Sequence, residues 1–176
     1  MAFCVVNTAF LAATNIDRSN LVGIYASADV ENGVFVTLDK MNLGTDGIVN
    51  GFEYTVNLAT ADDKDIYCVC TAEVPYGEDA FHNDPTRFIN RKGRPMAIKK
   101  MEIGDFIEIS EDGFVEGGYP TSAMVGYFAP IGADGKIDTP ISAIGSATGA
   151  FFKVEGLTKM TLGNETLNGC ILRRVQ

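Results

Sequence analysis

The sequence has no tryptophan, a single histidine and no long hydrophobic run. A lone histidine rules out any metal site or catalytic triad that needs two imidazoles. No segment approaches the ~20 apolar residues of a membrane-spanning helix, so we expect no membrane association. The first fifteen residues have no basic region and a broken apolar pattern, which is unlike a signal peptide and predicts a protein made in the cytoplasm.

Positive charge and cysteine are also scarce. The formal net charge of −9 makes nucleic acid an unfavourable partner, because the rest of the protein would repel a phosphate backbone. Cys68 and Cys70 alternate along one predicted strand and are too constrained for an easy mutual disulfide, whereas Cys4 and Cys170 lie near opposite ends. We therefore expect four buried thiols.

The chain is rich in glycine and in β-strand patterning. Nineteen glycines include six Asp-Gly or Asn-Gly pairs, which favour the positive φ angles of tight hairpins. Runs of β-branched and aromatic residues recur between these pairs, with little helical periodicity. Roughly eight to ten short strands, about ten residues apart, predict an all-β fold that is a sandwich or a barrel.

The length and the pattern together set the expected boundaries. A chain of 176 residues is long enough for one well-buried core and short for two domains. Residues 1–20 keep no regular period, so we expect an irregular N-terminal arm followed by a single β domain over residues 21–176. Within that domain, the strand predicted at 33–39 has apolar residues on both faces, which indicates a central or doubly packed strand.

Residues 75–100 interrupt the strand pattern with prolines, mixed charges and scattered apolar residues. We interpret this segment as one long loop, and long loops in compact domains are commonly binding elements. It contains six of the fourteen basic residues of an acidic chain. The segment is either a solvated loop or an electrostatic contact to an acidic partner. The candidate contact residues are Arg87, Arg91, Lys92 and Arg94.

Residues with catalytic potential are present without a recognisable catalytic pattern. A nucleophile and base pair of Cys68 or Cys70 with His82 is conceivable, but both cysteines alternate with large apolar residues on a predicted core strand, where a thiolate is disfavoured. Four carboxylates also follow one another within nine positions and offer a pair for glycoside hydrolysis, although solvated strand edges explain them better. They are Glu108, Glu111, Asp112 and Glu116. No phosphate-binding loop occurs, and we expect no cofactor, no metal site and no catalytic residue.

An Ala/Thr/Asn-rich start followed by "ASADVENGVFVTLDK", and the later "KMEIGDFIEISEDGF" and "FFKVEGLTKMTL", resemble small auxiliary head proteins of tailed bacteriophages. This resemblance implies a β-barrel or sandwich that decorates or cements a capsid. It further implies a non-enzymatic virion protein on the capsid surface, made in the cytoplasm of a bacterial host. The major capsid protein would be the partner, and a homo-oligomer, with a trimer favoured, would fit the lattice symmetry.

Two other functions stay open from the sequence. One is a phage tail or head-tail connector component, which is also a β-rich virion part. The other is a small hydrolase whose site is built from acidic residues such as Glu108 and Glu111.

Overall fold

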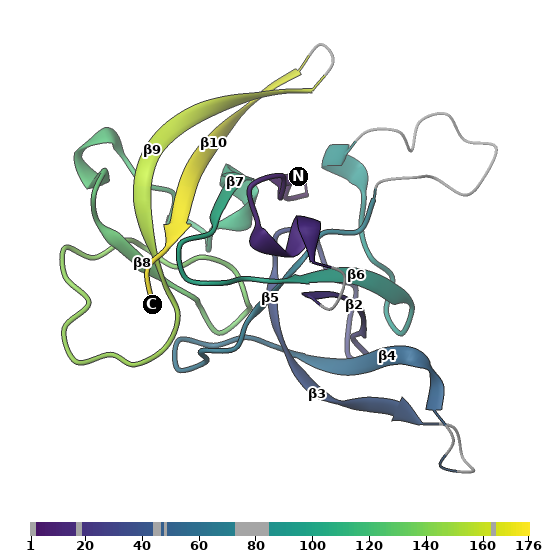
Figure 1. The fold of residues 1–176 in the computed structure, drawn as a ribbon. Coiled ribbons are helices and arrows are strands. Elements are labelled where there is room, and N and C mark those ends of the chain that lie inside the picture. Colours follow the sequence, from purple (N-terminus) through teal and green to yellow (C-terminus); the bar gives the residue numbers. More distant parts are fainter. Residues whose placement is uncertain (1–2, 17–18, 44–46, 48, 73–84, 163–164) are drawn as a thin grey trace.

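The computed structural model describes residues 3–16, 19–43, 47, 49–72, 85–162 and 165–176. Within these ranges the chain forms ten strands in two sheets, which confirms the predicted all-β fold (Figure 1). The only helices among the described residues are single turns of 3-10 helix. They are η1 (Ala12–Asn15), η4 (Pro85–Arg87), η5 (Glu111–Gly113) and η6 (Ser122–Met124). None of these helices is long and apolar enough to cross a membrane.

The first sheet is a closed five-stranded barrel with the strand order β2-β4-β3-β5-β6. All its neighbouring strands pair antiparallel except β2 and β4, which are parallel. Its strands are β2 (Asn20–Ile24), β3 (Phe35–Leu43), β4 (Val49–Leu58), β5 (Tyr67–Val69) and β6 (Pro95–Lys100). The barrel therefore takes up the N-terminal half of the chain.

The second sheet has five strands in the order β1-β7-β10-β9-β8, all antiparallel. It combines β1, from the start of the chain, with strands from the C-terminal half. Its strands are β1 (Val6–Asn7), β7 (Phe106–Ser110), β8 (Phe128–Pro130), β9 (Phe151–Leu162) and β10 (Glu165–Arg174). The β9–β10 hairpin is longer than its neighbours and projects beyond β7 (Figure 1).

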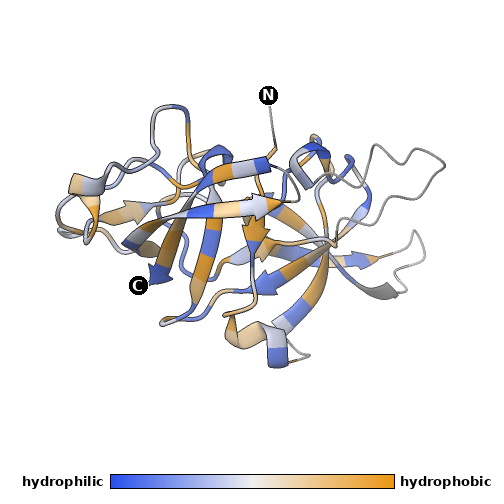
Figure 2. Ribbon diagram, turned by 90° about the horizontal axis from the view of Figure 1, so that it is seen from above, coloured by the Kyte–Doolittle hydropathy of each residue, from blue (hydrophilic) through white to orange (hydrophobic). Residues whose placement is uncertain are grey.

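Apolar and polar residues alternate along the strands (Figure 2), and the buried ones form two clusters. Val36 and Val69 belong to the smaller cluster, which consists of residues from the barrel segment. Phe35 and Cys68 point the other way, into a larger cluster that also contains Phe152 of the second sheet. Strand β3 is therefore buried on both faces where it begins, as its sequence predicts, and it joins the two sheets.

The glycine pairs have two different roles. Gly33, Gly47 and Gly135 have positive φ angles, as predicted for turns. In contrast, Gly113 and Gly169 have no positive φ, because they occupy η5 and the middle of β10. At these two positions a Cβ atom would lie 2.3 Å from the Ile109 side chain and 2.8 Å from that of Met160, so the missing side chain serves close packing.

The predicted arm and loop contain more regular structure than expected. The N-terminal segment contributes β1 to the second sheet, with Val6 opposite Ile109 of β7, and then forms η1. Of the loop predicted at 75–100, residues 75–84 lie outside the described ranges. The loop ends six residues earlier than expected, because Pro95–Lys100 pairs with β2 and β5 as strand β6. A proline at the first residue of a strand costs little pairing, which explains why it is tolerated there.

Candidate functional site

Three of the four predicted contact residues lie together in one tight turn between Asn90 and β6. The Arg94 N–H donates to the Arg91 carbonyl at 3.0 Å, and the Gly93 N–H donates to the Tyr25 carbonyl at 2.8 Å. Gly93 has a φ of +68°, which this turn requires and which other residues adopt at a cost. The side chains of Arg91, Lys92 and Arg94 are all exposed. We call these three the basic turn.

Arg87, the fourth predicted residue, lies outside the basic turn. It is the last residue of η4, four positions before Arg91, and its side chain is also exposed. Of the four predicted cations, three therefore lie together in the basic turn. The fourth, Arg87, lies on the neighbouring helical turn η4.

The carboxylate of Asp29 holds the basic turn from the barrel side. One oxygen accepts from the Lys92 backbone N–H at 2.8 Å, and the other accepts from the Arg91 guanidinium at 2.9 Å. These two hydrogen bonds, the backbone one first, lower the pKa of Asp29 below its usual value. The ion pair is solvent-exposed and adds little stability by itself, but it fixes the direction of the turn.

A buried polar network anchors the residue that precedes the basic turn. Asn90 exchanges backbone hydrogen bonds of 2.8 Å with Val30, and its side-chain amide donates to the Val30 carbonyl at 3.0 Å and to Asn32 Oδ1 at 3.1 Å. Asn32 Nδ2 in turn donates to the Thr71 carbonyl at 2.9 Å. Since Asn32 and Asn90 are buried, each hydrogen bond is expensive to break.

From its local pattern Asn32 is predicted only as a turn residue before Gly33, and no local pattern indicates a contact with Asn90, which lies 58 positions away. The basic turn is therefore presented on a rigid support that local sequence patterns do not reveal.

The acidic residues considered for hydrolysis are divided between two places. Glu108 lies on β7, where it accepts a hydrogen bond from Asn7, and lines a groove beside β1. The other three line a separate cavity of about 590 Å³, together with Glu31, Lys136 and aromatic residues. We call it the acidic cavity. The charged and aromatic residues that line it are Phe3, Glu31, Glu111, Asp112, Phe114, Glu116, Tyr119 and Lys136. Glu108 and Glu111, the pair named from the sequence, thus do not share a cavity.

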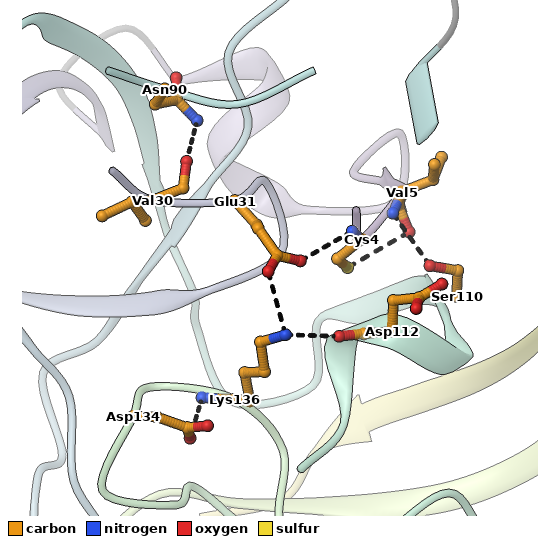
Figure 3. A network of polar contacts seen from close by, with 9 residues as sticks. All are labelled: Cys4, Val5, Val30, Glu31, Asn90, Ser110, Asp112, Asp134 and Lys136. Carbon is orange, nitrogen blue, oxygen red and sulfur yellow. Dashed lines mark hydrogen bonds and ion pairs between the residues drawn. The ribbon is translucent and has the colours of Figure 1, made fainter. Parts of the chain in front are cut away.

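Lys136 connects three segments at the acidic cavity (Figure 3). Its ammonium group lies 3.2 Å from one oxygen of Glu31 and donates to the Asp112 carbonyl at 2.9 Å. The other Glu31 oxygen accepts from the Cys4 backbone N–H at 2.9 Å. Glu31 therefore binds the N-terminal segment through the Cys4 amide, and the positive charge of Lys136 compensates the negative charge of Glu31.

Asp112 is a half-buried carboxyl group of this cavity. Partial burial, and after it the negative charge of Glu31, raise the pKa of Asp112 above its usual value, while Lys136 acts in the opposite direction. The cavity is lined by four acidic residues, one lysine and aromatic rings, so it has an excess of negative charge.

The thiols lie where the sequence predicts, with one difference. Cys4, Cys68 and Cys170 are buried, Cys70 is half-buried, and no disulfide joins any of the four. Burial raises the pKa of Cys4 and of Cys170 to about 12, and that of Cys68 well above its usual value. His82, the suggested partner of Cys68, lies outside the described residues. Among the part of the chain that is described, no group of three or more His, Cys, Asp or Glu residues is arranged to hold a metal ion.

Comparisons of this chain with protein-family models, with curated proteins and with solved structures gave no match.

Proposed function

We propose that this chain is a non-enzymatic virion structural protein that decorates the capsid of a tailed bacteriophage. In this proposal it is made in the cytoplasm of the host bacterium, binds the lattice of the major capsid protein from outside and assembles as a homo-oligomer, with a trimer favoured by lattice symmetry. The class of protein is proposed from the resemblance of its strand segments to auxiliary head proteins. The observation that carries the proposal is the rigidly held, exposed basic turn.

The basic turn has the properties that a protein contact needs. Its three cations are exposed, and the backbone beneath them is fixed by Asp29 and by the buried Asn90 network. A surface that is already ordered loses little conformational entropy on binding, so more of its interaction energy appears as affinity. On a chain with a net charge of −9, this local positive surface favours an acidic patch on the partner and fixes the orientation of docking.

The experiment that tests this role measures binding of purified chain to virus particles that lack it. The variant Lys92→Ser/Arg94→Ser removes two cations of the basic turn and leaves the Arg91–Asp29 pair intact. We expect its occupancy on particles to fall several-fold at low salt, with a weaker salt dependence than that of the wild type.

The matched control is Lys40→Ser/Lys64→Ser, which removes two exposed cations elsewhere and changes the net charge equally. It should bind as the wild type does. Equal occupancy of both double variants at low and at high salt would contradict the assignment of the basic turn as the lattice contact.

A further inference from the structure

Lys159 of β9 and Asn168 of β10 are directly opposite each other in the β9–β10 hairpin. Directly opposed residues of an antiparallel pair lie on the same face, with Cβ atoms about 4.5–5.5 Å apart. The ammonium group of Lys159 donates a hydrogen bond to Asn168 Oδ1. The register of two paired strands therefore holds a primary amine against a carboxamide group.

Glu111 of η5 contacts the other end of the same carboxamide. Its Oε2 atom accepts a hydrogen bond of 2.8 Å from Asn168 Nδ2. Glu111 is kept near β10 because Ser110, the residue before it, pairs with Gly169. The Tyr119 hydroxyl, which donates to the Gly169 carbonyl at 2.7 Å, also holds this part of β10. The carboxamide is thus contacted by an amine at its oxygen and by a carboxylate at its nitrogen.

The third group distinguishes these contacts from an ordinary hydrogen bond between two surface side chains. An ammonium group only donates and a carboxylate only accepts, so the two partners fix which end of the Asn168 amide faces each of them. The carboxylate of Glu111 lies on the nitrogen that must leave if the amine attacks the carboxamide carbon. Leu157 and the buried Cys170 are the next opposed pair on this face. The three side chains are therefore arranged as a nucleophile, an electrophile and a proton-transfer group.

We propose that Lys159 and Asn168 become joined by an isopeptide bond, with Glu111 as the proton-transfer group. The uncharged Lys159 amine attacks Asn168 Cγ and forms a new Cγ–Nζ bond. The Cγ–Nδ2 bond then breaks, while Glu111 carries a proton from the attacking nitrogen to the leaving nitrogen, which departs as ammonia. An ammonium group and a carboxamide thus give a secondary amide and an ammonium ion, so atoms and charge balance without an oxidant or a cofactor.

Proximity is the main contribution of the fold to this reaction. An amine and a carboxamide that are free in solution react slowly. Holding two reactants in contact converts a bimolecular step into an intramolecular one, with effective molarities of about 10⁵–10⁸ M for well-oriented groups. The reaction occurs once in each chain and consumes no external substrate, so it is compatible with a non-enzymatic protein.

The isopeptide bond ties the hairpin at the point where it leaves the sheet. Strand β7 pairs with residues 169–173 of β10, so the described residues of β10 before Gly169 pair with β9 alone. This end of the hairpin projects from the sheet (Figure 1). A cross-link between Lys159 and Asn168 therefore restricts the separation of two strands that have no third neighbour there.

Intact mass spectrometry of the folded full chain tests the proposed bond. We expect the chain to lose the mass of one ammonia molecule, faster at mildly alkaline than at neutral pH, because only the uncharged amine attacks. Tryptic peptide mapping should find residues 154–173 as one peptide, uncleaved after Lys159 and lighter by the same mass. A chain that keeps its full mass after prolonged incubation at both pH values would overturn the inference.

Two pairs of variants identify the reacting groups. Lys159→Arg keeps the positive charge but lacks the amine and should keep its full mass, whereas Lys153→Arg on the same strand should react as the wild type does. Glu111→Gln can still accept the hydrogen bond but cannot transfer a proton, so the reaction should slow roughly tenfold or more. Glu116→Gln removes an equal charge from another exposed residue of the acidic cavity and should leave the rate unchanged. Equal rates of the two glutamine variants would overturn the role of Glu111.

The dipeptide Asn168-Gly169 offers a competing reaction that these variants separate from cross-linking. The Gly169 backbone nitrogen can attack the Asn168 side chain, which also releases ammonia and leaves a cyclic imide. That product needs no lysine, so an equal loss of mass from Lys159→Arg would overturn the inference. Conversion of Asn168 to aspartate without a linked peptide would overturn it as well.

Discussion

The ring of Phe35 in the barrel packs on the ring of Phe152 in the second sheet, with centroids 4.9 Å apart and planes tilted by 41°. Both side chains are completely buried. The contact lies in the larger cluster, to which both sheets contribute. The barrel and the second sheet therefore share a core, and the surface assigned to binding is carried by one folded unit.

Replacing Phe35 by alanine should destabilise the whole chain. Loss of a buried aromatic ring leaves a cavity and typically costs about 3–5 kcal/mol, a large part of the stability of a domain. Phe10→Ala is the control, since Phe10 is 68% exposed and its truncation should cost less than about 0.5 kcal/mol. Urea unfolding of both variants measures the difference, and similar midpoints would contradict a shared core around Phe35.

Gly33→Ala should be more destabilising than Gly104→Ala, although both glycines have positive φ angles of +80° and +100°. At Gly104 nothing lies within 4 Å of an added Cβ, so only the backbone cost of about 1–2 kcal/mol applies. At Gly33 the added Cβ would lie 2.5 Å from the Cys4 sulfur, which adds about 1–3 kcal/mol of overpacking.

A double-mutant cycle with Cys4→Ala identifies the cause of the larger cost at Gly33. Removing the sulfur should recover part of it, and thermal melts of the four proteins report this coupling. Strict additivity of Gly33→Ala and Cys4→Ala would show that the Cys4 contact is not responsible.

Asp112→Asn should stabilise the protein at neutral pH. Because the folded-state pKa of Asp112 is raised, the folded chain binds this proton more tightly than the unfolded chain does. The charged form therefore opposes folding, and its penalty grows as the pH rises through the interval between the ordinary and the raised pKa. The gain of the variant over wild type should be full at pH 7 and should disappear below that interval.

Melting temperatures measured from pH 3 to 8 test the Asp112 prediction, with the exposed Asp62→Asn as the control for a lost negative charge. A gain that is independent of pH, or an equal gain from the control, would refute the role of Glu31 and of burial at Asp112.

Asn90→Ala should weaken particle binding without removing any charge. The substitution removes the side-chain hydrogen bonds from Asn90 to Asn32 and to the Val30 carbonyl, at a cost of about 1–3 kcal/mol, and loosens the support of the basic turn, while the backbone hydrogen bonds to Val30 remain. Asn57→Ala on exposed β4 surface is the control and should change neither stability nor binding. Particle occupancy is measured at a temperature where the variant is folded. Wild-type occupancy of Asn90→Ala would mean that a fixed turn is not needed.

Local sequence patterns predicted the features of this fold that depend on neighbouring residues. The alternation around Phe35 gave a doubly buried strand, and the polar, basic segment from Arg87 to Arg94 gave an exposed element. Each of these properties follows from side chains that are close in sequence, since strand periodicity and turn chemistry are local.

The rest depends on contacts between distant positions. The Glu31–Lys136 ion pair joins residues 105 positions apart, and the parallel pairing of β2 with β4 requires a particular path of the chain. Asn50-Gly51 and Asn168-Gly169 resembled turns but lie within β4 and β10, because strand pairing there overrides local turn preference. The anchoring of the basic turn is therefore not visible in one sequence.

The most direct test of the proposed function is the copy number of this chain in virus particles purified from the source of this sequence. Quantitative mass spectrometry should find about one copy per major capsid protein, or one per class of lattice vertex, as decoration of a symmetric lattice requires. A handful of copies per particle would indicate a tail or connector component instead. Absence of the chain from the particles would contradict a structural role in the virion.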